Sequence, residues 1–180
     1  MKGKIGSTEI HLVTEDITLL EVDAFVFYAR PDLKLGSGFG SAINIRGGPG
    51  IQEELDKIGK ASVGQAVVTS GGKLKAKNII HAVGPAFQEM ETEKKLVDAV
   101  RNVLKKADEL GADSIAMPPM GSGFYGVAPE MCARIQLGQL AKHLKKETGL
   151  KKVFFCLPDH RDMEPFEKAL ASMQATRSIP

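Results

Sequence analysis

Short apolar segments alternate with amphipathic ones along this chain, and this alternation limits its fold more than any other feature. Five segments rich in Val, Ile, Phe and Ala are almost continuously apolar, as strands covered on both faces are. They occupy residues 23–29, 65–70, 78–83, 114–120 and 151–157. A sixth segment, residues 7–13, alternates polar and apolar side chains and predicts a half-buried strand. The sequence therefore predicts a sheet enclosed between two layers.

Segments with helical spacing separate these strands. Residues 92–111 place Leu96, Val100 and Leu104 on one face, and residues 129–149 begin with a proline and end with a glycine, which favour a helix start and stop. Shorter helices are expected over residues 41–46, 50–59 and 163–173. Because strands and helices alternate, we expect an α/β protein, a three-layer α/β/α sandwich with a mixed, mostly parallel central sheet.

The length of 180 residues favours one domain, which we place at residues 1–174, with residues 175–180 as a C-terminal tail. No apolar run is long enough to span a membrane, and the first residues lack the apolar core of a signal peptide. We therefore expect a cytoplasmic protein without a membrane partner.

Composition argues against several kinds of site. The two cysteines, Cys132 and Cys156, form no C-x-x-C pair, and no histidine cluster has metal-ligand spacing, so no disulfide framework, metal or cofactor is predicted. The net charge of +2 is too small to indicate nucleic acid by itself, and no specific nucleic-acid partner is expected. His81 falls inside a predicted strand and is interpreted as a structural histidine.

Two glycine-rich segments each follow a predicted strand. Residues 121–126, GSGFYG, fit the G-x-G-x-x-G pattern, but they lie late in the chain, Pro129 delays the next helix, and the following acid, Asp159, comes too late for a dinucleotide-binding unit. Residues 33–50 contain the second cluster, GSGFG. Glycines allow the backbone to approach a phosphate closely, and ligands bind at the carboxyl ends of strands in such sheets. Together the loops predict a site for a diphosphate.

These segments resemble the macro domain, a family that recognises ADP-ribose and its derivatives. The resemblance covers nearly the whole chain, through EIHLVTEDITLLEVDAFVF, SGFGSAI, GQAVVTSGGKLKAKNIIHAVGP and SIAMPPMGSGFYGV. It implies that one loop faces the diphosphate and distal ribose and that another forms the main diphosphate loop, with Tyr125 over the distal ribose. The residues are Ser37, Gly38, Phe39, Gly40 and Ser41 in the first loop, and Gly121, Ser122, Gly123, Phe124, Tyr125 and Gly126 in the second.

The resemblance also implies an adenine site. Asp16, with the Ile17 backbone beside it, would accept a hydrogen bond from the adenine amino group, and a carboxylate there would repel the carbonyl of guanine. The alternative is that Asp16 only caps a helix that begins near Ile17, and both roles can hold with one oxygen each. The residue that stacks on adenine is expected near Pro158, His160 or Phe166.

The chain departs from the hydrolytic members of the family, which carry Asn-Ala-Ala-Asn and a loop aspartate. This chain has Phe27-Tyr28-Ala29-Arg30 in place of Asn-Ala-Ala-Asn and Gly40 in place of the aspartate. It also has Asn44 in place of the histidine that usually follows the aspartate. Arginine is not a base, and Arg30 either lies against the ligand or has no role in the site. We therefore expect a binder of ADP-ribose, free or attached to protein. The alternatives are a hydrolase of ADP-ribosyl esters, O-acetyl-ADP-ribose or ADP-ribose-1″-phosphate with other catalytic groups, and a binder of poly(ADP-ribose) or of a terminal RNA adenylate.

Overall fold

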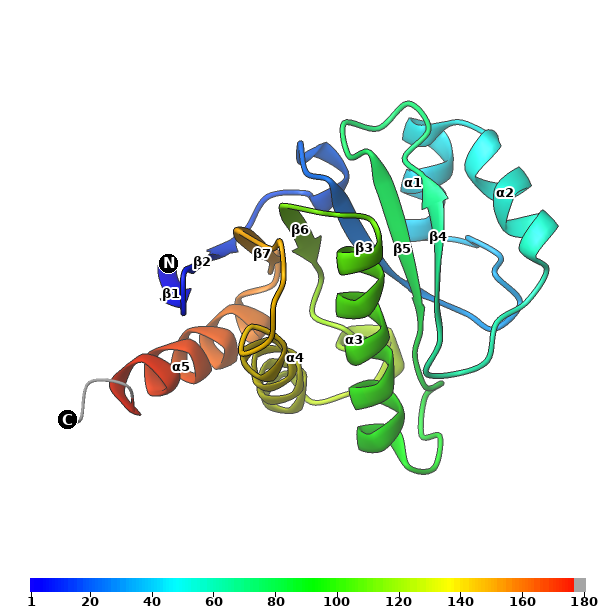
Figure 1. Cartoon of the computed structure of the whole chain (residues 1–180). Helices are drawn as coiled ribbons and strands as arrows, with labels where there is room; N and C mark the ends of the chain where they lie inside the picture. Colours follow the sequence, from blue (N-terminus) through cyan, green and yellow to red (C-terminus); the bar gives the residue numbers. More distant parts are fainter. Residues whose placement is uncertain (177–180) are drawn as a thin grey trace.

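The computed structural model describes residues 1–176, which form a single sheet flanked by helices (Figure 1). The strands are β1 (Lys2–Ile5), β2 (Thr8–Val13), β3 (Ala24–Ala29), β4 (Ala66–Ser70), β5 (Asn78–Val83), β6 (Ser114–Met117) and β7 (Lys152–Cys156). The helices are α1 (Phe39–Gly47), α2 (Gly50–Ile58), α3 (Thr92–Glu109), α4 (Pro129–His143) and α5 (His160–Thr176), with short 3-10 helices η1 (Ile17–Leu19) and η2 (Gly123–Tyr125).

The strand order is β1-β2-β7-β6-β3-β5-β4. The five inner strands run parallel, and β1 and β4 pair antiparallel at the two edges. The predicted mixed, mostly parallel sheet is therefore confirmed. All six predicted strands are present, and β1 is an additional edge strand.

Successive side chains of β3 enter two separate cores. Phe25 and Phe27 belong to the core beneath α1 and α2, with Ile43 of α1. Val26 belongs to the core beneath α3, α4 and α5, with Leu96 of α3. All six residues of β3 are buried, which explains why this segment is continuously apolar. Figure 1 shows α1 and α2 on one side of the sheet and α3, α4 and α5 on the other.

The C-terminal helix reaches the limit of the described residues. α5 includes residues 175 and 176, and the rest of the tail expected over residues 175–180 lies outside the part of the chain that the structure describes. Within residues 1–176, each helix is too short or too polar to cross a membrane.

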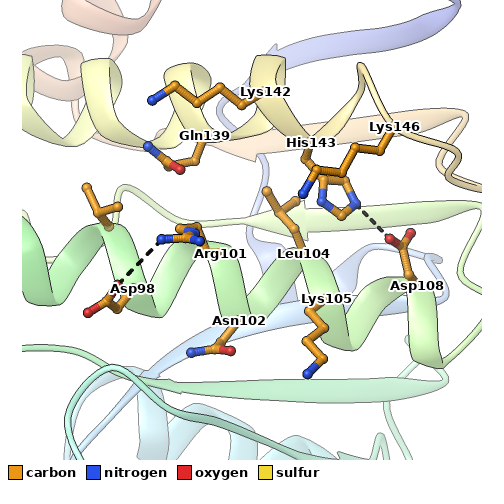
Figure 2. A pocket seen from close by; sticks show the side chains of 11 residues that line it. Asp98, Arg101, Asn102, Leu104, Lys105, Asp108, Gln139, Lys142, His143 and Lys146 are labelled. Carbon is orange, nitrogen blue, oxygen red and sulfur yellow. Dashed lines mark ion pairs between the residues drawn. The ribbon is translucent and has the colours of Figure 1, made fainter.

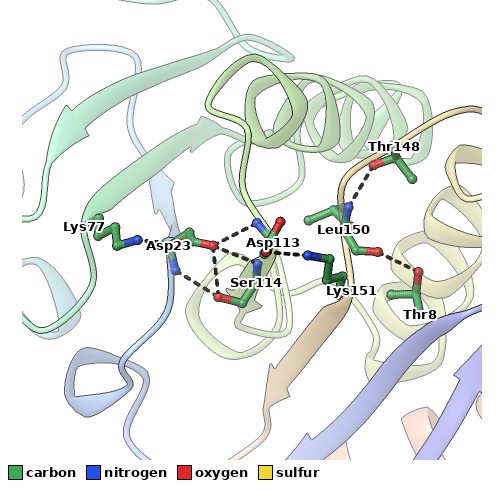
Figure 3. Close-up of polar contacts among 8 residues, drawn as sticks. All are labelled: Thr8, Asp23, Lys77, Asp113, Ser114, Thr148, Leu150 and Lys151. Atoms are coloured by element: carbon green, nitrogen blue, oxygen red, sulfur yellow. Dashed lines mark hydrogen bonds and ion pairs between the residues drawn. The ribbon is translucent and has the colours of Figure 1, made fainter.

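Asp23 joins the amino ends of the central strands (Figure 3). Its Oδ2 atom accepts hydrogen bonds from the backbone N–H groups of Asp113, at 2.8 Å, and Ser114, at 3.1 Å. Its own N–H donates to Ser114 Oγ at 3.0 Å. The Lys77 ammonium lowers the pKa of the Asp23 carboxyl, as do the two N–H donors, although burial opposes them. The first residues of β3 and β6 are thus held together.

His81 is a buried residue of β5. Its Nε2 atom lies 2.9 Å from Thr69 Oγ1, and its ring meets Phe27 edge-on at 5.9 Å. Burial lowers the pKa of His81 to about 4, partly offset by the charge of Glu54. The imidazole is therefore neutral at pH 7 and packs within the core, as expected of a structural histidine.

The low pKa of His81 predicts a loss of stability in acid. Below pH 6.5, the ordinary pKa of histidine, the unfolded chain takes up a proton that the folded chain does not, so the free energy of unfolding falls until the pH reaches about 4. The full loss is about 3 kcal/mol. Denaturant unfolding of the wild type and of His81→Gln across pH 7 to 4 measures it. We expect the free energy of unfolding to fall more steeply between pH 7 and 4 in the wild type than in His81→Gln. Parallel profiles would contradict the low pKa of His81.

Candidate functional site

A cavity of about 470 Å³ opens at the carboxyl edge of the sheet, between the loops that follow β3 and β6. We call it the crevice. The residues that line it are Phe27, Tyr28, Arg30, Lys34, Leu35, Gly36, Ser37, Gly38, Phe39, Gly40, Pro118, Pro119, Gly121, Ser122, Phe124 and Tyr125. Both predicted glycine loops are therefore brought together in one place.

The crevice exists because β3 and β6 separate. They pair only over Ala24–Phe25 and Ile115–Ala116, near their amino ends. Pro118 and Pro119 follow β6, and proline has no N–H to continue a ladder. β3 runs on beside β5 to Ala29, so its last residues form one wall of the crevice while the prolines form another.

The loop before α1 presents backbone to this space. Gly36 and Gly38 have φ values of 68° and 61°, which glycine adopts most readily. Gly38 is the N-cap of α1 and supplies no side-chain cap, so the first N–H groups of the helix are left for another acceptor. Gln52 of α2 holds the loop from behind by accepting from Leu35 N–H at 3.0 Å.

The loop after β6 is anchored from a distant part of the chain. Gly121, Gly123 and Gly126 have positive φ values, and Val127 N–H donates to the Gly121 carbonyl at 2.9 Å. Ser122 Oγ donates to Asp162 Oδ1 at 2.5 Å, and Asp162 is almost fully buried in the first turn of α5. Asp162 fixes the predicted diphosphate loop, and sequence reasoning missed it because the contact spans 40 residues.

Two tyrosines form an aromatic wall of the crevice. The rings of Tyr28 and Tyr125 lie 4.5 Å apart, and Tyr28 donates to the Pro85 carbonyl at 2.5 Å. Burial raises the pKa of Tyr28 well above its usual range, so the phenol stays neutral. Phe124 is 87% exposed at the mouth, although it also lines the crevice.

The charged lining of the crevice is positive. Arg30 and Lys34 line it, and they pair outside it with Asp32, at 2.5 Å, and Asp56, at 2.6 Å. No Asp or Glu occurs among the described residues that line the crevice. Open backbone N–H groups and two cations favour an anionic ligand. Lys34 was not among the residues that the sequence singled out.

Asp16 lies beyond the lining residues, after the carboxyl end of β2. It is the N-cap of η1, and its Oδ1 accepts from Thr18 N–H at 2.9 Å. Its Oδ2 accepts from Arg46 of α1 at 2.5 Å. Burial opposes the ionised form, but the hydrogen bonds from Arg46 and Thr18 lower the pKa of Asp16. The carboxylate is therefore charged and 43% exposed, as an acceptor for a ligand must be.

The remaining predicted residues lie outside the lining. Gly123 and Gly126 belong to the loop after β6 but do not line the crevice. Ile17 is buried, Ser41 and Asn44 lie within α1, Pro158 is exposed just before α5, and His160 is exposed at its first residue. Phe166 requires a correction. It is fully buried on the inner face of α5, with its ring 5.1 Å from that of Phe155, so it is not available to stack on adenine.

The two cysteines are core residues. Cys132 donates to the Met120 carbonyl at 3.2 Å, and both thiols are buried. Burial raises the pKa of Cys132 and of Cys156 to about 12. Neither is a thiolate at neutral pH, so neither is an activated nucleophile.

Comparison with known proteins gives the family. The macro domain pattern matches residues 29–136. This chain belongs to the macro domain family. An uncharacterized protein of Saccharolobus solfataricus is 48% identical over 153 residues, which are 83% of this chain and 85% of that protein. The family resemblance inferred from the sequence is thereby confirmed.

Solved macrodomains share the fold over nearly the whole chain. The Oceanobacillus iheyensis macrodomain with ADP has a TM-score of 0.90 and 25% identity, covering 98% of this chain and 97% of that one. The Trypanosoma brucei macrodomain in complex with ADP-ribose has a TM-score of 0.82 and 28% identity, covering 88% of this chain and 68% of that one.

Proposed function

We propose that this protein binds ADP-ribose, free or attached to a protein, in the crevice and does not hydrolyse it. The observation that carries this proposal is the pair of glycine loops facing each other across a cavity lined by cations and lacking carboxylates among its described residues. A diphosphate needs close backbone approach and N–H donors, and both loops offer them. Related macrodomains bind ADP and ADP-ribose, which supports the same ligand here.

Gly40 is the main reason to expect no hydrolysis. A Cβ atom at Gly40 would lie 1.7 Å from the carbonyl oxygen of Leu35, which is backbone and has no room to move aside. An aspartate at this position, as in the hydrolytic members, therefore does not fit this loop. Phe27 and Arg30 likewise replace neutral amides that would hold water near the distal ribose.

We expect ADP-ribose to bind with an affinity on the order of micromolar, about −8 kcal/mol. Ser37 is exposed, lines the crevice and has an ordinary backbone conformation, so it accepts a larger side chain without strain. Ser37→Glu should weaken binding at least about tenfold, because its charge repels the diphosphate. The matched control, Ser37→Gln, should bind clearly better. Calorimetric titration measures the affinity of the wild type and of both variants for ADP-ribose. If the wild type shows no binding heat up to millimolar ligand, the proposal is wrong.

Asp16 should determine the choice of base. Asp16→Ala should weaken ADP-ribose by about 1.5–3 kcal/mol, the cost of losing a hydrogen bond to a charged group, and should leave ribose-5-phosphate unaffected. The hypoxanthine analogue of ADP-ribose, which presents a carbonyl instead of the amine, is the matched ligand. The wild type should discriminate against it and the variant should not. If the variant only lowers thermal stability, Asp16 serves as the cap of η1 alone.

Turnover should be absent. We expect no release of ADP-ribose from aspartyl- or glutamyl-modified protein, or from O-acetyl-ADP-ribose, above the rate without protein, since loss of a positioned base or amide typically costs 10²–10⁴-fold. Product is quantified by liquid chromatography, with a hydrolytic macrodomain as positive control. Measurable wild-type turnover would overturn the binder assignment, and its loss in Ser41→Ala or Asn44→Ala would identify the replacement group.

A further inference from the structure

Ser122 lines the crevice with a hydroxyl group whose proton is already in use. Ser122 Oγ donates to Asp162 Oδ1 at 2.5 Å. Asp162 is 7% exposed and lies in the first turn of α5, where the helix N-terminus stabilises a negative charge. No lysine or arginine pairs with Asp162 in the described chain, and the adjacent Arg161 pairs with Asp159 at 2.5 Å instead. Ser122 therefore supplies a hydrogen bond that this buried carboxylate needs.

This hydrogen bond decides what Ser122 offers to a ligand. A carboxylate ion only accepts hydrogen bonds, so the single proton of Ser122 points toward Asp162 and the lone pairs of its Oγ atom remain for other partners. Donation of that proton to a ligand would leave the buried carboxylate unsatisfied, which is costly. Ser122 is half-buried in the lining of the crevice. It therefore presents an acceptor, which repels a phosphate oxygen and matches a hydroxyl group.

The strand order indicates which hydroxyl group this is. β2, β7, β6 and β3 are parallel neighbours, so the segments that follow them lie along one edge of the sheet. Asp16, the expected adenine partner, follows β2, α5 follows β7, and the two glycine loops follow β6 and β3. The adenine and the diphosphate are thus expected two strands apart, about 10 Å, and the adenosine ribose lies between them. Ser122 turns toward α5, on the adenine side of its loop.

We propose that Ser122, held in place by Asp162, accepts a hydrogen bond from a hydroxyl group of the adenosine ribose. The crevice then selects ribonucleotides over their deoxy analogues. Asp162 is a positioning residue, because it is buried and acts through Ser122. A hydroxyl oxygen whose proton is donated to a charged group is itself a stronger acceptor, which favours this pairing. The inference rests on the proposed function, since it concerns the ligand of the same crevice.

A larger hollow, of about 900 Å³, lies between α3 and α4 and is the alternative place for a nucleotide (Figure 2). Its walls are helices, whose backbone N–H groups are bonded within each helix, and no glycine occurs among the described residues that line it. Figure 2 shows Lys105 and Lys142 pointing away from each other, and Asp108 Oδ2 lies 2.8 Å from His143 Nε2. The close backbone approach that a diphosphate needs is therefore found at the crevice and not here.

The test is calorimetric titration with ADP-ribose and with its analogues that lack the 2′- or the 3′-hydroxyl group of the adenosine ribose. The wild type should bind at least one analogue about two- to tenfold more weakly than ADP-ribose, the effect of one lost hydrogen bond. Ser122→Ala should bind ADP-ribose more weakly by the same factor and should no longer discriminate against that analogue. A merely structural role of Ser122 would weaken all three ligands equally.

Further variants separate Ser122 from its surroundings. Ser37→Ala removes a hydroxyl group from the opposite loop and should keep the wild-type discrimination between ADP-ribose and the analogue. Asp162→Ala should reduce the discrimination, and Asp162→Asn, whose amide oxygen still accepts from Ser122, should restore it. Arg101→Gln, in the larger hollow, should bind ADP-ribose like the wild type.

The wild-type comparison needs no variant, so it stands even where Asp162→Ala does not fold. Equal binding of ADP-ribose and both analogues would overturn this inference alone, as would discrimination that survives in Ser122→Ala. Full discrimination in folded Asp162→Ala would overturn the role of Asp162. Loss of ADP-ribose binding in Arg101→Gln would place the ligand in the larger hollow and overturn the inference. If the wild type binds none of the three ligands, the proposed function is wrong and this inference is wrong with it.

Discussion

The burial of β3 on both faces is the constraint on which the remaining structure depends. Every residue of this strand is buried, so its side chains are apolar or aromatic and helices must cover both sides of it. Phe27 illustrates the consequence. Its ring packs edge-on against Phe39 at 5.1 Å, and Phe39 is the first residue of α1. The glycine loop that precedes α1 is thus tied to the sheet by aromatic packing.

The same strand sets the distance between the two loops that form the crevice. Asp23 binds the amino ends of β3 and β6 together through two backbone N–H groups, and Pro118 and Pro119 end their pairing a few residues later. The strands are therefore joined at one end and apart at the other. The loops at the open end start from strands that are held by hydrogen bonds and buried packing, which would reduce the ordering cost of binding a ligand there.

Most of the fold could be predicted because burial on both faces leaves a direct signature in the sequence. β1 was not predicted, because its sequence, KGKI, is short and largely polar. It forms a strand by pairing with β2. The two loops were predictable because glycine is needed wherever φ is positive. Asp162 and Lys34 were not, because their roles arise from contacts across the fold. Phe166 was misassigned although Leu170, one turn later, is buried on the same face, a spacing that indicates core.

The backbone around Gly40 limits which residue this position can hold. The Leu35 carbonyl fills the space that a side chain at position 40 would need, so this loop could hold a carboxylate there only by moving its backbone. Gln52 opposes that movement, because it accepts from the Leu35 N–H and donates to the Leu33 carbonyl at 3.2 Å. Gly40 itself is buried, although it lines the crevice. An aspartate at position 40 would have to displace the Leu35 carbonyl and the two hydrogen bonds that the Gln52 side chain makes to the loop backbone, so substitution of Gly40 alone would not place a carboxylate in the crevice while the loop keeps this conformation.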